Sequence, residues 1–494
     1  MAERRSASQP WILAATILGS SLVFIDATVV SIALPIVQGA FRASAAQAQW
    51  VVEAYTLVLG ALMLLGGALG DRYGRRLLFV SGVVLFAAGS LLCGLATSMP
   101  ALIAARVVQG LGGAMVAPAS LAIIAACFEG ADRAKAIGTW SGLTAVATAV
   151  GPVAGGAIVE HFGWRWVFFI NLPIAIAVVA LALLHMPENR DESERGTPDL
   201  VGSLLVTGGL AGIVYGFIAS GQDGWTAGSI AALAGGCGAT VAFIAFERHA
   251  RNPILPLDLF GRRDFTGINL MTLLLYGALS ALFYFLPFVM IQVDGYGATV
   301  VGLSMLPFIV LMVLLSRFSG ALAYRIGARS LLVAGPLVTA AGFALLALLR
   351  DLHYWNAIFP AVACIGFGMG LTVAPLTTTL LESVPEGHVG LASGVNNATS
   401  RVAGLLSIAV LGVLLGVVFN ARLSARIAQL SPQLQAQVDA QRPAMAAARF
   451  SDPRETAAVR DSYADGFRAV AFACAFLAAA SAGVSATAVS GRRS

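Results

Sequence analysis

The sequence predicts an all-helical integral membrane protein, with two six-helix halves and two helices inserted between them. Hydrophobic residues make up 58% of the 494 residues and charged residues 11%, whereas a soluble globular protein carries about 25% charged residues. Runs of about twenty apolar residues recur along the chain, which is the length that a helix needs to cross a hydrocarbon core of about 30 Å. One stretch of sequence also occurs twice, which indicates repeated halves.

Fourteen apolar windows predict the transmembrane helices. In chain order they cover residues 11–33, 49–70, 77–97, 101–125, 137–159, 165–185, 200–219, 228–247, 266–290, 300–322, 330–349, 356–380, 398–419 and 466–489. Each window is close to the spanning length, so each is expected to cross the membrane once.

The basic residues predict the orientation, because Lys and Arg gather in cytoplasmic loops. They are frequent in the loops on one side of the predicted helices, as at Arg72, Arg133 and Arg248, and rare in the short loops on the other side. Both termini are therefore expected in the cytoplasm, and the segment 421–465 is expected to be an outer loop. That segment carries charges of both signs, and long loops obey the charge rule poorly.

The repeat joins the second and third helices of each half. "GALGDRYGRRLLFVSG" at 67–82 matches "GALAYRIGARSLLVAG" at 320–335 with the same spacing. Repeated halves are typical of secondary transporters, which bind their substrate where the halves meet. We therefore expect an N-terminal six-helix half over 1–190, two inserted helices with linkers over 191–262, and a C-terminal six-helix half over 263–494.

Several function classes lack their motifs in this sequence. No GxxxxGK[ST] phosphate loop occurs and Lys135 is the only lysine, so ATP is not expected to be the energy source. Neither HExxH nor GxSxG occurs, which argues against an enzyme. The five cysteines stand singly in apolar stretches, so no metal site is expected. The net charge of +5 comes from loop arginines that fix topology, so no nucleic acid is expected as a partner.

The first, second and fourth predicted helices each contain one charged residue, where a lone charge is costly: Asp26, Glu53 and Arg106. Asp26 lies about fifteen residues, or about 22 Å, beyond the cytoplasmic start of its helix, and hence about 8 Å below the outer boundary. Glu53 and Arg106 lie near the same level on helices that run the opposite way. Arg106 is therefore expected to pair with Asp26 or Glu53. The alternatives are a purely structural ion pair, a Glu53 that reaches water, and an Arg106 that only anchors its helix.

Five motifs resemble those of the fourteen-helix drug:proton antiporters of the major facilitator superfamily. They are "DATVVSIALP" from Asp26, "GALGDRYGRR" from Gly67, "RVVQGLGGA" from Arg106, "GPVAGG" from Gly151 and "WRWVFFINLP" from Trp164. The resemblance covers essentially the whole chain. It implies the major facilitator fold, with the first, second and fourth helices beside a central cavity, and proton coupling by the three buried ionisable residues.

Two of these motifs predict residues that gate the conformational change. Glycines permit tight turns and close helix contact, and charged loop residues can hold neighbouring helix ends. The expected gating residues are Gly67, Asp71, Arg72, Gly74, Arg75, Arg76, Gly151, Pro152, Gly155 and Gly156. The alternatives are a loop that only fixes topology and glycines that only allow close packing. In the second repeat Tyr324 replaces the aspartate, so that half is not expected to have the same latch.

Aromatic and amide side chains are expected to line a substrate cavity. The candidates are Tyr55, Gln109, Tyr284 and Phe288. Contiguous aromatics such as Phe283 and Phe285 point round the whole helix, so at most one or two of this group are expected to face a cavity. Asn396 and Asn397 are expected to open the thirteenth helix, as a cap and anchor or as part of a gate.

The resemblance implies a proton-coupled exporter of lipophilic or cationic small molecules such as drugs, with protons as the coupling ion and no other cofactor. It implies a bacterial-type cytoplasmic (inner) membrane, and a monomer is expected. A site with carboxylates suits cations, because partly desolvated charges attract more strongly than charges in water. The alternative is an exporter of one metabolite, antibiotic or siderophore. A receptor or scaffold is a further class, but neither requires repeated halves.

Overall fold

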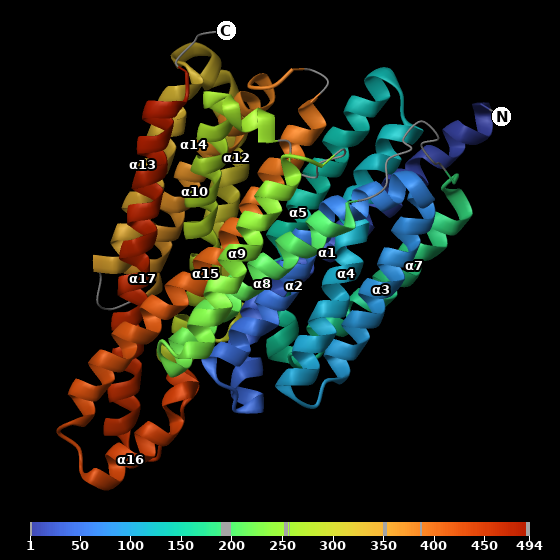
Figure 1. The fold of residues 1–494 in the computed structure, drawn as a ribbon. Helices are drawn as coiled ribbons and strands as arrows, with labels where there is room; N and C mark the ends of the chain where they lie inside the picture. Colours follow the sequence, from blue (N-terminus) through green and yellow to red (C-terminus); the bar gives the residue numbers. More distant parts are fainter. Residues whose placement is uncertain are drawn as a thin grey trace. The chain divides into compact units, whose positions relative to one another are not determined.

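The computed structural model describes residues 2–188, 199–250, 255, 257–348, 353–385 and 388–490, and in these ranges it contains helices and no strand (Figure 1). The α-helices are α1 (Ala2–Phe41), α2 (Ala45–Tyr73), α3 (Arg75–Leu95), α4 (Met99–Cys127), α5 (Gly130–Phe162), α6 (Trp166–Phe169), α7 (Asn171–His185), α8 (Leu200–Asp223), α9 (Ala227–Glu247), α10 (Arg263–Phe288), α11 (Ala298–Ser304), α12 (Leu306–Ile326), α13 (Ala328–Leu348), α14 (Phe359–Glu382), α15 (Val389–Ile427), α16 (Pro432–Gln441) and α17 (Pro453–Ala488). Short 3₁₀ or π turns are η1 (Leu257–Gly261), η2 (Val289–Val293), η3 (Tyr354–Ile358) and η5 (Arg442–Ala447).

The predicted all-helical fold class is confirmed. Among the described residues, thirteen helical segments are long and apolar enough to cross a membrane, and α2 adds a further helix of 29 residues. The fourteen predicted helices therefore all have a counterpart. The segment 421–465, which was expected to be an outer loop, is largely helical, because α15 continues to Ile427, α16 and η5 follow, and α17 already begins at Pro453. Its location on the outer side stays a prediction. Apolar windows end where a helix leaves the hydrocarbon, so they miss its polar extension.

The chain divides into two compact units. Unit 1 consists of Met1–Val37, Trp50–Gly212 and Gly235–Ile254, and unit 2 of Gln38–Gln49, Ile213–Ala234 and Leu255–Ser494. Each unit contains one copy of the sequence repeat, while the two inserted helices, α8 and α9, are each divided between the units. The domain boundaries expected from the sequence stay a prediction, and the one at 190/191 lies outside the described residues.

The two copies of the repeat form the same turn. Gly74 stands between α2 and α3 with φ of 118°, and Gly327 stands between α12 and α13 with φ of 89°. Both angles lie in the region that L-residues avoid, so glycine is the residue that allows either turn. The sequence match therefore reflects one backbone geometry used twice.

Close helix crossings in each unit also rest on paired glycines. A Cβ atom on Gly112 of α4 would overlap the Gly82 carbonyl of α3, and one on Gly368 of α14 would overlap the Gly335 carbonyl of α13. Helices without side chains at a crossing can approach until their backbones touch, which is how membrane helices gain packing energy without a hydrophobic driving force. The α3–α4 and α13–α14 pairs thus fix the interior of their units in the same way.

Local sequence signals set several helix starts. Ser44 precedes α2, its Oγ accepts from the Gln47 amide at 3.2 Å, and its own amide donates to Gln47 Oε1 at 3.1 Å, which is a reciprocal capping box. Ser98 caps α4 by accepting from the Ala101 amide. A helix start leaves backbone amides without intrahelical partners, and these caps satisfy some of them. They therefore fix the starts of α2, which carries Tyr55, and of α4, which carries Arg106.

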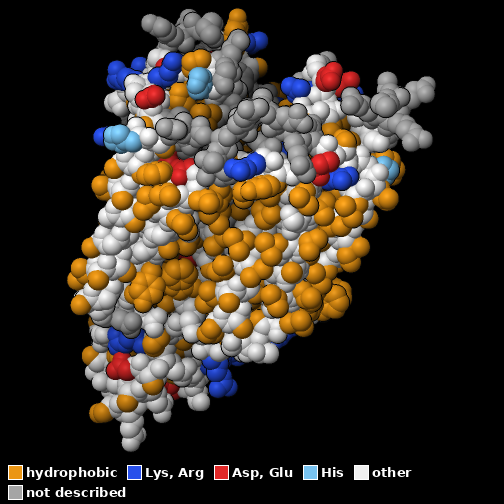
Figure 2. All heavy atoms as spheres, turned by 45° about the vertical axis from the view of Figure 1, so that its right-hand side comes forward, with side chains coloured by type: hydrophobic (Ala, Val, Ile, Leu, Met, Phe, Trp, Pro, Cys, Tyr) orange, Lys and Arg blue, Asp and Glu red, His pale blue; other side chains and the backbone are white. Residues whose placement is uncertain are grey.

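Many large hydrophobic side chains lie on the surface. Large hydrophobic side chains such as Leu184, Ile176 and Phe476 are more than 70% exposed. Figure 2 shows that hydrophobic side chains cover the middle of the face drawn, and that charged side chains gather toward its two ends. An apolar surface of this extent is stable in contact with lipid rather than water, which agrees with the thirteen apolar spans.

Candidate functional site

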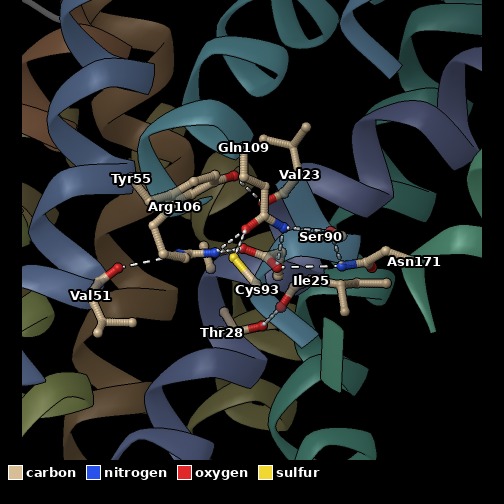
Figure 3. Close-up of polar contacts among 12 residues, drawn as sticks. Val23, Ile25, Thr28, Val51, Tyr55, Ser90, Cys93, Arg106, Gln109 and Asn171 are labelled. Atoms are coloured by element: carbon tan, nitrogen blue, oxygen red, sulfur yellow. Dashed lines mark hydrogen bonds and ion pairs between the residues drawn. The ribbon is translucent and has the colours of Figure 1, made fainter. Parts of the chain in front are cut away.

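A buried ion pair lies at the centre of unit 1 (Figure 3). Arg106 of α4 places Nη1 at 2.5 Å from Oδ2 of Asp26 on α1, and both residues are 1% exposed. A charge that is buried without a partner costs several kcal/mol, roughly 3–5 kcal/mol when one member of a pair is removed. The apolar helix therefore tolerates Asp26 because Arg106 reaches it across the interior.

Three polar side chains complete the cluster. Gln109 stands one turn after Arg106 on α4; its Nε2 donates to Asp26 Oδ1 at 2.8 Å, and its Oε1 accepts from Arg106 Nη1 at 2.6 Å. Ser90 of α3 accepts from Gln109 at 2.8 Å and from Asn171 at 3.1 Å. Asn171, the first residue of α7, also donates to Asp26 Oδ1 at 3.4 Å. The carboxylate thus accepts hydrogen bonds from donors on two further helices.

Tyr55 of α2 covers the other side of the guanidinium. The Cζ atom of Arg106 lies 4.1 Å from the centre of the Tyr55 ring, and the Tyr55 hydroxyl donates to the Val23 carbonyl of α1 at 3.1 Å. Arg106 Nε donates to the Val51 carbonyl of α2 at 3.0 Å. A guanidinium over an aromatic face gains about 2 kcal/mol when it is desolvated. Arg106 is therefore held by α1, α2 and its own helix together.

Glu53 is fully buried on α2, at 0% exposure. Residues two apart on an α-helix point about 200° apart, so Glu53 leaves α2 on a different side from Tyr55, which packs on Arg106. Of the two partners expected for Arg106, the ion pair above joins it to Asp26. A proton-carrying role for Glu53 stays a prediction.

Ser90 and Asn171 are members of the cluster that the sequence reading did not single out. Each is a small polar residue inside an apolar run, and such residues carry no periodic signal. Asn171 belongs to the motif "WRWVFFINLP", in which Arg165 donates to the Ala96 carbonyl at the end of α3. The signal that could have identified Asn171 is a neutral amide at the start of an apolar helix, because a buried amide requires a polar partner.

The glycines of α5 lie against α1 close to Asp26. A Cβ atom on Gly151 would collide with the Thr28 side chain, and one on Gly155 would lie 2.7 Å from Val29 Cγ1. Pro152 is inside α5 and Gly156 is buried beside this contact. The face of α5 that carries these residues therefore packs directly on the turn of α1 that follows Asp26, where movement of either helix changes the surroundings of the carboxylate.

The loop between α2 and α3 joins helix ends of unit 1. Arg76 Nη1 donates to the Met186 carbonyl at the end of α7 at 3.0 Å, and its Nε lies 3.5 Å from Glu188 Oε2. Arg72 is exposed and Arg75 is half-buried, while a Cβ atom on Gly67 would lie 3.7 Å from Pro118. The side chain of Asp71 lies outside the described residues. Because a helix C-terminus carries partial negative charge, Arg76 is a favourable partner for α7.

The four predicted cavity residues occupy two different places. Tyr55 and Gln109 belong to the charged cluster, whereas Tyr284 and Phe288 line a cavity of about 200 Å³ inside unit 2. Phe285 lines the same cavity, and Phe283 packs on Phe308 instead. The expectation that at most two of these aromatics face a cavity is therefore wrong. Positions i, i+1 and i+4 span only about 100° of a helix, so three of them share one face.

The asparagines of the thirteenth helix do not open it. Asn396 lies inside α15 and its Nδ2 donates to Thr272 Oγ1 at 2.8 Å and to Asn269 Oδ1 at 3.1 Å, both on α10. Asn397 donates to the Ser393 carbonyl of its own helix. The predicted helix start was too late, because the polar first turns of α15 fall outside an apolar window. Asn396 is a polar link between α10 and α15.

Known proteins resemble this chain along most of its length. The multidrug resistance protein Stp of Mycobacterium tuberculosis is 36% identical over 410 residues, which cover 81% of this chain and 74% of that protein. The tetracenomycin C resistance and export protein of Streptomyces glaucescens is 33% identical, with 82% and 76% covered.

Solved structures and family profiles agree with these relatives. The crystal structure of a bacterial homolog of the human lysosomal transporter Spinster superposes with a TM-score of 0.69 at 17% identity, over 98% of this chain and 97% of that chain, which shows a shared fold. The profile described as Major Facilitator Superfamily matches residues 16–428. The chain therefore belongs to the Major Facilitator Superfamily, as its helix motifs predicted.

Proposed function

We propose that this protein is a proton-coupled exporter of lipophilic small molecules, drugs among them, in a bacterial-type cytoplasmic membrane with both termini in the cytoplasm. The observation that carries the proposal is the buried Asp26–Arg106 pair, with its 2.5 Å contact between α1 and α4. The names of the relatives, which include a multidrug resistance protein and an antibiotic export protein, support the substrate class. No chemical conversion of the substrate is part of the proposal.

In the proposed cycle, Asp26 exchanges Arg106 for a proton. Oδ2 holds the guanidinium in the described state, so a proton reaches that oxygen only when Arg106 moves aside. The Tyr55 ring and the Val51 carbonyl give Arg106 partners on α2 that do not involve Asp26. Protonation from outside then favours one arrangement of the helices. Release of the proton inside, as substrate enters, favours the other, because a ligand drives a change only through unequal affinity for two states.

The contact between α1 and α5 is proposed to transmit this exchange. Gly151 and Gly155 let α5 lie directly on Thr28 and Val29, within one turn of Asp26, so a shift of α1 on proton binding would act on the α5 backbone through these two residues. Arg76 and the carbonyl of Met186 are proposed to hold α3 to α7 while this occurs.

The decisive experiment replaces Asp26 by Asn in inverted membrane vesicles that carry a proton gradient. Asp26→Asn is expected to lose gradient-driven transport completely, since the amide accepts no proton at the working pH. Asp132→Asn is the matched control, because Asp132 is exposed in the first turn of α5. Transport by Asp26→Asn at the wild-type rate would refute the assignment of the proton site. Glu53→Gln is expected to slow transport less, since Asp26 is the carboxylate that pairs with the buried Arg106.

Breadth of substrate is tested separately. A growth-inhibition panel of dyes, quaternary ammonium compounds and antibiotics in a pump-deficient host is expected to show resistance to several classes. Resistance to a single compound would favour the alternative, an exporter of one metabolite, antibiotic or siderophore. The relative named as a tetracenomycin C resistance and export protein supports testing this alternative. Ligand-evoked proton release from the purified protein in detergent distinguishes either exporter from a receptor or scaffold.

A further inference from the structure

We propose that the cavity of unit 2 is a binding site for an uncharged aromatic compound that carries a carbonyl oxygen, and that the amide of Gln49 recognises this oxygen. The site is separate from the charged cluster of unit 1. It extends the exporter proposal by naming a compound class, and it is testable by binding alone.

The cavity has an aromatic wall and an amide wall. Tyr284, Phe285 and Phe288 of α10 supply the first, with ring centres of Tyr284 and Phe288 5.4 Å apart and those of Tyr284 and Phe285 4.8 Å apart and nearly perpendicular. Gln38 and Gln49 lie in the second wall. A flat ring that enters meets both ring faces and ring edges, and aromatic pairs favour such offset and edge-to-face contacts.

Gln49 is the polar group that points to a ligand. It is 7% exposed, and its Nε2 is a buried donor with no hydrogen-bond partner among the described residues. Gln38 differs, because its Nε2 donates to the Ala43 and Ala444 carbonyls and its Oε1 accepts from Gln292. Leaving a buried donor unsatisfied costs about 1–3 kcal/mol, so a site of this kind favours a ligand that brings an acceptor.

Gly412 of α15 leaves space for the Gln49 amide at the cavity wall. A Cβ atom on Gly412 would lie 3.1 Å from Gln49 Oε1 and 3.5 Å from its Nε2, so the amide rests where a side chain would otherwise be. One turn later, a Cβ atom on Gly416 would lie 3.5 Å from the terminal methyl of Met445. Met445 of η5 has φ of 50°, a strained value for a residue other than glycine, and its side chain lines the same cavity.

The charges of the cavity wall cancel. Asp439 and Arg442 line it, and Arg442 Nη2 lies 2.5 Å from Asp439 Oδ1. The paired charges leave neither an anionic nor a cationic group for a ligand, so the cavity favours an uncharged compound. This preference differs from that of a site with a free carboxylate, which favours a cation.

The volume sets the size of the ligand. An apolar cavity of about 150 Å³ admits benzene, so the 200 Å³ here accommodates one or two fused rings. Two fused rings, no charge and one carbonyl oxygen describe coumarin. Naphthalene has the rings without the acceptor, and N-methylquinolinium has the rings with a positive charge, so these three probes separate the contributions of shape, hydrogen bond and charge.

The test is equilibrium dialysis of the three labelled probes against the purified full-length protein in lipid nanodiscs, with empty nanodiscs subtracted. Gln49→Leu is expected to weaken coumarin binding about tenfold and to leave naphthalene binding unchanged. Its thermal stability is expected to stay the same or rise, because the variant removes an unpaired buried amide, whereas a structural role would lower it. Gln435→Leu is the matched control, since that amide caps the Leu430 carbonyl away from the cavity.

Two further variants make the outcome unambiguous. Gly412→Val is expected to fill the wall and weaken binding of both neutral probes, while Asp26→Asn is expected to bind coumarin as the wild type does even though it does not transport. The proposal is overturned by coumarin binding that Gln49→Leu leaves unchanged, by N-methylquinolinium binding tighter than coumarin, or by no saturable coumarin binding. Transport by Asp26→Asn at the wild-type rate, with coumarin binding intact, would count against the exporter cycle alone.

Discussion

The fourth helix of each half occupies a matching place in its unit, yet the buried faces differ in charge. Gly89 of α3 packs on Gln109 of α4, and Gly342 of α13 packs on Ile365 of α14. The residue at this close crossing is thus a glutamine in unit 1, which Gly89 meets at its backbone and Cβ, and an isoleucine in unit 2. The two crossings therefore differ in side-chain chemistry.

The difference extends to the ion pair. One turn before Gln109 stands Arg106, and one turn before Ile365 stands Val362, which is also 1% exposed. Asp26 stands as far before the Leu-Pro pair of α1 as Ala278, at 0% exposure, stands before that of α10. A repeated scaffold therefore carries charge in one copy and an ordinary apolar core in the other. Helix packing does not require the Asp26–Arg106 pair, which favours a functional over a purely structural reading.

The most disruptive way to test this comparison is to copy unit 2 into unit 1. Arg106→Val leaves Asp26 buried without its partner, and we expect a loss of about 3–5 kcal/mol in unfolding free energy, measured by denaturation in detergent, together with loss of transport. The double variant Asp26→Ala, Arg106→Val copies both residues of unit 2 and is expected to recover most of the stability but no transport. A double variant as unstable as the single one would contradict the comparison.

The glycine contacts between the first and fifth helices of each half give a smaller effect. Gly155→Ala would meet the Val29 side chain and backbone, and we expect a loss of about 1–3 kcal/mol and slower efflux. Gly404→Ala, the corresponding contact of α15, meets only Ser280, which can turn its hydroxyl away, so its effect is expected to be smaller. Gly138→Ala on α5 is the control, since no atom lies within 4 Å. Equal effects of Gly155→Ala and Gly138→Ala would show that packing on α1 is unimportant.

The two turns of the repeat are expected to respond alike. Gly74→Ala and Gly327→Ala each force an L-residue into positive φ, at a cost of about 1–2 kcal/mol, which thermal unfolding of the purified variants measures. We expect the melting temperatures of both variants to fall by a similar amount. A lower melting temperature for Gly74→Ala alone would mean that the second turn can relax to accommodate an L-residue and that the first turn cannot.

The smallest effect is expected at the arginines that follow these turns. Arg76 donates to the Met186 carbonyl at the end of α7, and Arg329 donates to the Ala486 carbonyl near the end of α17. Each contact is expected to contribute about 0.3–1 kcal/mol, so Arg76→Ala and Arg329→Ala should lower the melting temperature slightly, and less at high salt. A salt-independent loss would point to packing rather than charge.

These arginines show what a sequence repeat can reveal. Tyr324 in place of aspartate predicted that the second half lacks the same latch, and this stays a prediction because the side chain of Asp71 lies outside the described residues. The arginine contact occurs in both units, since Arg329 donates to the Ala486 carbonyl as Arg76 donates to the Met186 carbonyl. The repeat pattern carries backbone turns and caps reliably, because these depend on one or two residues at fixed spacing. The ends that they reach are far away in sequence, so spacing alone does not identify them.

For the candidate site, the sequence predicted how deep its charged residues lie in the membrane. Counting residues along straight helices placed Asp26 and Arg106 at one level, and their pairing follows from the cost of lone buried charges. Ser90 and Asn171 were missed for a different reason. Hydrogen bonds among small polar side chains depend on helix rotation within a few tens of degrees, and apolar windows contain no information about rotation.

Because all but one of the Lys and Arg residues are arginine, amine-reactive dyes can be used to measure movement of this protein. Lys135 is the only lysine, and it lies exposed in the first turns of α5, on the helix whose glycines contact α1. An amine-reactive fluorophore would therefore mark this helix end and the amino terminus alone, without removal of any native residue. Paired with a second dye at an engineered site in unit 2, it provides a single-molecule distance reporter for the proposed alternation between states.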